Sequence, residues 1–126
     1  MANGKRAYIL TDTVAPGANA TLETEHRVGA NERFTGTHIL IERTGTFNIT
    51  KITNDSGLPF TNADTSDPIT GAAFPDALTE HGKWLELTAP IIVERSDAIK
   101  FEVVDTSGAT NTVRIHLLGS MEQMEK

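Results

Sequence analysis

The sequence predicts an all-β fold: a single-domain, antiparallel β-sandwich of about seven to nine short strands. Three observations support this prediction. The chain has 126 residues, the usual size of one domain. About one residue in seven is threonine, which favours half-buried, pleated strands. Apolar and polar residues alternate in several short segments, and no long segment shows the 3.6-residue repeat of an amphipathic helix.

The first half of the chain contains four candidate strands. Two short strands are expected near residues 7–10 and 21–26. A third is expected at residues 37–42, and a turn separates it from a fourth at residues 46–50. Ile52 is out of phase with the alternation of the fourth strand, which predicts that this strand either ends there or contains a bulge.

The middle of the chain is predicted to be a long connection. The segment from Asn54 to Asp76 is rich in Gly, Pro, Asn, Asp, Ser and Thr, and we expect at most one edge strand in it. Residues 74–82 are the best helix candidate, with at most about two turns. Short strands are then expected at residues 83–87 and 91–93, on either side of Pro90.

The clearest alternation lies near the C-terminus. The segments 98–103 and 112–117 each place three apolar residues on one face and charged residues on the other. Between them, residues 105–111 form a cluster of turn-forming residues, so we expect a β-hairpin. This ending, with the long excursion in mid-chain, predicts a jelly roll rather than an immunoglobulin domain.

Three parts follow from this organisation. Residues 1–18 are an N-terminal arm or a first strand, residues 19–119 form the β-sandwich, and residues 120–126 are a polar tail. The net charge of −6 argues against binding to nucleic acid or to an anionic membrane surface. The absence of cysteine excludes a disulfide scaffold and a thiol nucleophile. Neither a membrane span nor a signal peptide is expected.

No residue pattern predicts an enzyme, a cofactor or a metal centre. The four histidines are dispersed along the chain, and none has another histidine within four positions, so we interpret them as surface residues of the sheets. The acidic residues near turns have no neighbour that would separate their pKa values as general acid–base catalysis requires. We therefore expect no catalytic, cofactor-binding or metal-binding residue in this chain.

Candidate interface residues come from the N-terminal segment and from the outward faces of the strands. The N-terminal segment has β character and could add a strand to the sheet of a neighbouring chain, or it could be the first strand of its own sandwich. Apolar residues on outward strand faces would form a subunit contact if they cluster. The candidates are Lys5, Arg6, Tyr8, Ile9, Leu10, Leu40, Val104 and Leu118.

A resemblance to a known family rests on the second half of the chain. Leu85–Val103 contains an apolar strand, a Pro-Ile step at Pro90, a Glu-x-x-Asp turn at residues 94–97 and an amphipathic strand. This segment, continued by Thr112–Gly119, resembles the back half of the small head proteins of tailed phages. Residues 34–49 are compatible with the same class, so the resemblance covers roughly residues 34–119.

The resemblance implies a jelly-roll decoration, or cement, protein. Members of this class sit on the outer surface of a phage capsid, often as dimers or trimers, and bridge neighbouring major capsid subunits without a cofactor. The expected partners are therefore the major capsid protein and further copies of this chain, in a virion assembled after synthesis in the host cytoplasm. The alternative is a glycan-binding β-sandwich from a tail fibre or an adhesin, in which Trp84 would stack on a sugar.

Overall fold

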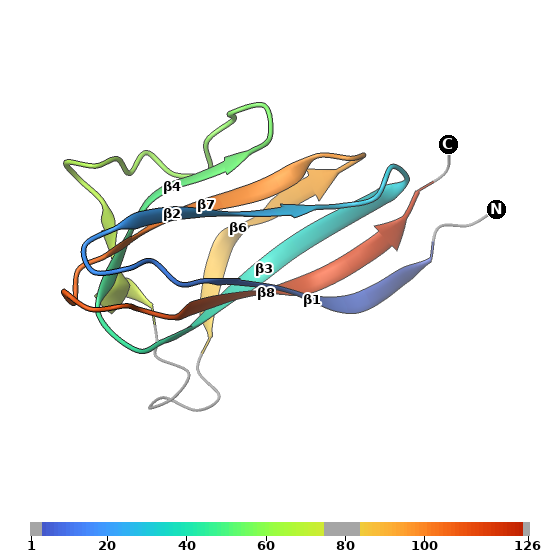
Figure 1. Cartoon of the computed structure of the whole chain (residues 1–126). Helices are drawn as coiled ribbons and strands as arrows, with labels where there is room; N and C mark the ends of the chain where they lie inside the picture. The colour runs from blue at the N-terminus through green and yellow to red at the C-terminus, as the bar shows by residue number, and fades with distance from the viewer. Residues whose placement is uncertain (1–3, 75–83, 125–126) are drawn as a thin grey trace.

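The computed structural model describes residues 4–74 and 84–124 and forms two four-stranded antiparallel sheets packed face to face (Figure 1). The first sheet has the strand order β1-β8-β3-β6, and the second has the order β2-β7-β4-β5. A short 3₁₀ helix, Gly71–Ala73, follows β5. The strands are β1 Lys5–Val14, β2 Thr21–Arg27, β3 Glu32–Arg43, β4 Phe47–Asn54, β5 Ile69–Thr70, β6 Leu85–Glu94, β7 Ala98–Asp105 and β8 Val113–Gln123.

Strand pairing is nested along the chain. The first strand pairs with the last, β2 with β7, β3 with β6 and β4 with β5, always antiparallel. This is the connectivity of a jelly roll, in which a long antiparallel ribbon is rolled into two sheets. The predicted all-β sandwich with jelly-roll character is therefore confirmed.

The core lies between the two sheets because alternation sends every second side chain inward. On β7, Ile99, Phe101 and Val103 are buried, and on β8 the same holds for every second residue from Val113 to Leu117. The largest fully buried side chains are Phe34, Phe47, Phe101, Leu10, Ile41, Ile49, Ile99, Ile115, Leu117, Val93, Val103 and Val113.

The hairpin predicted at the C-terminus is wrong, although both of its strands exist. Strand β7 belongs to the second sheet and pairs with β2 and β4, whereas β8 belongs to the first sheet and pairs with β1 and β3. The connection between them therefore crosses from one sheet to the other (Figure 1). Its turn-forming residues are the same kind that close a hairpin, so local sequence does not separate the two cases.

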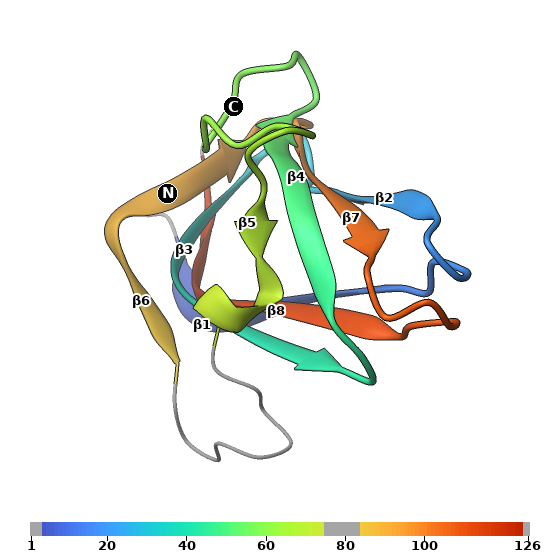
Figure 2. The ribbon, with the colours of Figure 1, turned by 90° about the vertical axis from the view of Figure 1, so that its left-hand side faces the viewer.

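Strand β6 joins the two short strands predicted on either side of Pro90. It lies at the edge of its sheet, where a residue that lacks a backbone N–H is tolerated. Figure 2 shows that β6 bends between its two halves, and its pairing with β3 shifts register between Gly36 and His38. The helix expected at residues 74–82 falls almost entirely outside the described residues.

Strand β4 contains a bulge, one of the two outcomes predicted from the position of Ile52. Its pairing with β7 shifts register between Ile49 and Lys51, which is the bulge that lets Ile49 and Ile52 both face the core. The long connection contains one short edge strand, β5, which lies beside β4 (Figure 2).

The first and the last strand both belong to the sandwich. Strand β1 pairs with β8 along its whole length, from Lys5 opposite Glu122 to Val14 opposite Val113. Strand β8 continues to Gln123, so residues 120–123 form strand rather than the predicted polar tail. They do so because both β1 and β3 supply backbone partners to this part of β8.

Two glycines face each other in the middle of the first sheet. Gly36 on β3 lies opposite Gly119 on β8, and Tyr8 on β1 lies on the other side of Gly119. A Cβ atom on Gly119 would overlap the backbone oxygen of Thr35. The ring of Tyr8 packs edge-on against the ring of Phe34, with their centroids 5.9 Å apart, in the same region of the core.

The loop from β7 to β8 is held by two buried polar side chains. Asn111 accepts a hydrogen bond from the Gly45 backbone N–H (3.0 Å) and donates to the Thr46 carbonyl (2.8 Å) and to the carboxylate of Asp105 (3.1 Å). A further hydrogen bond, donated by the Ser107 hydroxyl, is the main reason that the pKa of Asp105 lies well below its ordinary value. These contacts fasten the crossing loop to its neighbours.

Candidate functional site

The outward face of the β1-β8-β3-β6 sheet gathers apolar side chains. Ile9 on β1 pairs with Leu118 on β8, and Leu118 in turn pairs with His38 on β3. Leu40 lies two residues further along β3, so it shares this outward face. Ile9 is 57% exposed, and the side chains of Leu40 and Leu118 are partly exposed beside it.

Strand β6 adds two more apolar side chains to the same face. Ile92 lies opposite Thr35 between the buried residues Ile91 and Val93, and it is 47% exposed. Trp84 directly precedes β6 and is 42% exposed. Leu85 pairs with Ile39. If the pairing is extended by one position, Trp84 lies opposite Leu40. We call these five residues the outer patch: Ile9, Leu40, Trp84, Ile92 and Leu118.

Polar groups on this face bind to one another. The Thr11 hydroxyl lies 2.9 Å from Nδ1 of His116, and Nε2 of His116 lies 2.7 Å from the Glu42 carboxylate. Arg114 reaches the same carboxylate at 3.6 Å. A chain of hydroxyl, imidazole and carboxylate is also used in nucleophilic catalysis. Here it lies on an open sheet face, and three cavities in the described part of the chain are lined by other residues.

Charged residues border the outer patch at both ends: Glu42 and Arg114 lie at one end, and Arg33 with its two partners lies at the other. Arg33 on β3 binds Glu94 on β6 at 2.5 Å and Glu122 on β8 at 3.4 Å. The hydrogen bond to Glu94 is the main cause that raises the pKa of Arg33 above its ordinary value. The face therefore has apolar side chains, with His38 and Glu86 opposite each other among them, between ion pairs at both ends. Apolar side chains bordered by charged groups are common in protein interfaces.

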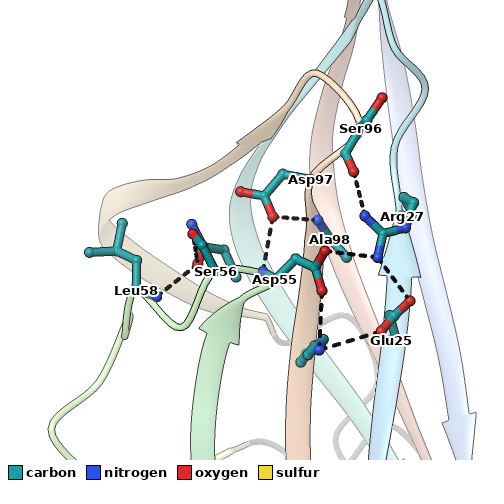
Figure 3. A network of polar contacts seen from close by, with 10 residues as sticks. Glu25, Arg27, Asp55, Ser56, Leu58, Ser96, Asp97 and Ala98 are labelled. Carbon is teal, nitrogen blue, oxygen red and sulfur yellow. Dashed lines mark hydrogen bonds and ion pairs between the residues drawn. The ribbon is translucent and has the colours of Figure 1, made fainter.

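The outward face of the other sheet is charged and internally paired (Figure 3). Arg27 binds Glu25 (3.3 Å) and Asp55 (3.0 Å), and Lys100 binds Asp55 (3.2 Å) and Glu25 (3.5 Å). Hydrogen bonds from Arg27 first, and then from Lys100, lower the pKa of the Asp55 carboxyl. The backbone N–H of Asp55 also donates to the carboxylate of Asp97 (Figure 3). This network fixes the loop after β4, and it offers no apolar anchor.

The structure brings only some of the sequence-predicted interface residues together. Ile9, Leu40 and Leu118 share one face, and the alternation had predicted the outward direction of Leu40 and Leu118. Leu10 is wrong as an interface residue, because it is buried in the core opposite Leu117. Val104 lies on the other sheet.

The remaining candidates lie along the first half of β1. Tyr8 is half-buried against the core. The guanidinium of Arg6 lies over its ring, 5.5 Å from the centroid, and Lys5 is exposed at the start of the strand. The sequence reasoning missed Ile92, although the alternation Ile91-Ile92-Val93 places the middle residue on the outside.

The described residues contain shallow cavities but no metal cluster. A cavity of about 450 Å³ beside the turn between β3 and β4 is lined by Arg43, Phe47, Gly71 and neighbouring residues. A second, of about 390 Å³, lies under the loop after β4. Within residues 4–74 and 84–124, no group of three His, Cys, Asp or Glu side chains could hold a metal ion.

Comparison with protein-family models, curated protein sequences and solved structures finds no significant match to this chain. Across the described part of the chain, no helix has the length and apolar character needed to cross a membrane.

Proposed function

We propose that this protein is a structural, non-catalytic β-sandwich that docks on other proteins through its outer patch. One observation carries the proposal: Ile9, Trp84 and Ile92 are each about half exposed on the same sheet face, between two sets of ion pairs. Large apolar side chains on a polar-rimmed face are typical of docking surfaces. Full burial of one such side chain is worth roughly 1.5–3 kcal/mol.

The finer proposal is capsid decoration. In it, the protein binds the outer surface of a phage head across neighbouring major capsid subunits, as a homo-oligomer of two or three copies, and stabilises the shell. The jelly-roll connectivity and the resemblance of residues 34–119 to small phage head proteins support this choice. A capsid repeats the same docking site many times, so modest affinity per copy is multiplied by avidity when the copies are linked. No cofactor, membrane or nucleic acid takes part.

The test uses purified protein and undecorated heads of the phage whose genome encodes it. We expect the protein to co-sediment with the heads and to raise their melting temperature. Ile92→Glu should weaken binding at least tenfold, because it places a charge within the outer patch. The matched control is Leu58→Glu, since Leu58 is 59% exposed but lies in the loop after β4, away from the outer patch. Absence of binding, or equal loss in both variants, would overturn the proposal.

The second candidate is glycan binding, which the exposure of Trp84 favours. An exposed indole can stack on the apolar face of a sugar ring. A glycan array with the wild-type chain and with Trp84→Ala separates the two functions. Binding that disappears in Trp84→Ala but persists in Ile92→Glu would support the glycan function, whereas an array without signal would refute it.

A further inference from the structure

Strand β1 leaves one side of its backbone unpaired. It is one of the two edge strands of its sheet, and among the described residues it pairs with β8 alone. The N–H of Gln123 donates to the carbonyl of Gly4, which lies directly opposite in the same register. In an antiparallel ladder, such hydrogen-bonded pairs alternate with pairs whose backbone groups point away. The odd-numbered residues from Lys5 to Thr13 therefore direct their N–H and C=O groups to the free edge.

Two charged side chains on β1 face the inner side of the sheet. Arg6 lies opposite Met121 and Asp12 opposite Ile115, both core residues. The Oδ1 atom of Asp12 lies 3.3 Å from Nδ1 of His26, whereas its Oδ2 atom is buried and has no hydrogen-bond partner among the described residues. Arg6 is 55% exposed at its side chain and has only a loose contact, at 3.8 Å, with a carboxylate oxygen of Glu32. The strand thus carries an incompletely satisfied acid and an exposed base.

We propose that a second copy of this chain pairs with the free edge of β1, antiparallel, with Ile9 opposite Ile9 of the second copy on a two-fold axis. The hydrogen-bonded pairs of this register join odd-numbered residues only: Lys5 opposite Thr13, Ala7 opposite Thr11, and Ile9 opposite itself. The pairing therefore uses the backbone groups that β8 leaves unpaired, and it unites the two β1-β8-β3-β6 sheets into one continuous sheet.

Charge complementarity selects this register from the other symmetric ones. With Ile9 on the axis, Arg6 of each copy lies opposite Asp12 of the other, on the same face of the joined sheet. The two residues form a non-hydrogen-bonded pair, the kind in which opposing side chains are closer. The guanidinium then pairs with the carboxylate of Asp12, whose side chain is 15% exposed in the single copy. Sliding the pairing by two residues would place Arg6 opposite Leu10 or Val14 instead, both apolar.

The pairing also changes the outer patch. Ile9 of the two copies becomes adjacent in the middle of the joined sheet, so one apolar surface runs across the two-fold axis. Two linked copies can then hold two neighbouring sites on a repeating partner, which is the condition for avidity. The dimer itself does not depend on what the outer patch binds.

The experiment measures mass by sedimentation velocity over a range of protein concentrations. We expect the wild type to form a dimer. Arg6→Asp and Asp12→Arg should each dissociate at least tenfold more readily, because like charges then face each other. An equimolar mixture of the two variants should dimerise again, because both contacts between positions 6 and 12 of a mixed dimer join an acidic to a basic side chain. Two variants that had lost dimerisation only because they misfold would not form a dimer when they are mixed.

A backbone variant gives an independent readout. Ala7→Pro removes an N–H that points to the free edge, and it leaves the β1–β8 ladder intact. We expect this variant to be a folded monomer, whereas Ile92→Glu should remain a dimer that fails to dock. A wild type that stays monomeric up to its solubility limit, or a mixture that does not dimerise, would overturn the pairing. Neither result would by itself refute docking through the outer patch.

Discussion

Replacing Asn111 with alanine is the sharpest test of how the crossing loop is held. The Asn111 side chain is fully buried and makes four hydrogen bonds. Its amide oxygen accepts from the Gly45 N–H and the Thr44 hydroxyl, and its amide nitrogen donates to Thr46 and Asp105. The substitution removes all four and leaves these partners to find water or remain unsatisfied.

The expected loss of stability follows from this geometry. A typical hydrogen bond contributes about 1 kcal/mol net, and a buried group left unpaired costs about 1–3 kcal/mol. Because the partners lie at one end of the sandwich, where water can reach some of them, we expect Asn111→Ala to lower the free energy of unfolding by about 3 kcal/mol. For a domain of this size, that corresponds to a decrease in Tm of about 10 °C.

Urea denaturation followed by circular dichroism measures this change. The slope of the unfolding free energy against urea should stay constant, because the variant alters stability and not the surface exposed on unfolding. Thr110→Ala is the matched control, since Thr110 is the exposed neighbour of Asn111, and it should change stability by less than about 0.5 kcal/mol. If Asn111→Ala were as stable as Thr110→Ala, the proposed role of the side chain in fastening the loop would be refuted.

Three further predictions concern other parts of the molecule. Gly119→Ala should lower stability by more than about 3 kcal/mol, because the Cβ would overlap the Thr35 backbone, whereas Gly17→Ala, with open space around it, should fold normally in the same urea assay. Below about pH 4, Tm should fall, because the pKa of Asp105 is lower in the folded than in the unfolded chain, so protonation of this carboxylate favours unfolding. Asp105→Asn should make Tm depend less on pH in this range. Ile92→Glu should leave the free energy of unfolding within about 0.5 kcal/mol of wild type, because its side chain is half exposed; a larger loss would assign Ile92 to the fold.

The sequence predicted the strands better than it predicted their partners. The alternation of apolar and polar residues identified the inward residues of β7 and β8, since this pattern depends only on residues that are close in sequence. It did not reveal that these strands lie in different sheets. The contacts that direct the crossing loop come from distant residues: the Asn111 backbone N–H donates to the Pro16 carbonyl, and its side chain binds Gly45 and Thr46. No local pattern encodes such partners.

The candidate interface was predictable to a similar extent. The alternation placed Leu40 and Leu118 outward, and pairing then brought them beside Ile9. Leu10 was included because the whole N-terminal segment was treated as one surface. Adjacent residues of a strand point to opposite faces, so an exposed Ile9 requires a buried Leu10 when the strand belongs to the sandwich. The pairing of β1 with β8, more than 100 residues away, decided between the two interpretations.

The nested pairing also governs when the outer patch is completed during synthesis. Ile9 leaves the ribosome more than 100 residues before its sheet neighbour Leu118. Long-range strand pairs form late, because the intervening chain must first be brought together. A nascent chain that ends before Leu118 therefore lacks a complete outer patch, whatever its first strands have already formed.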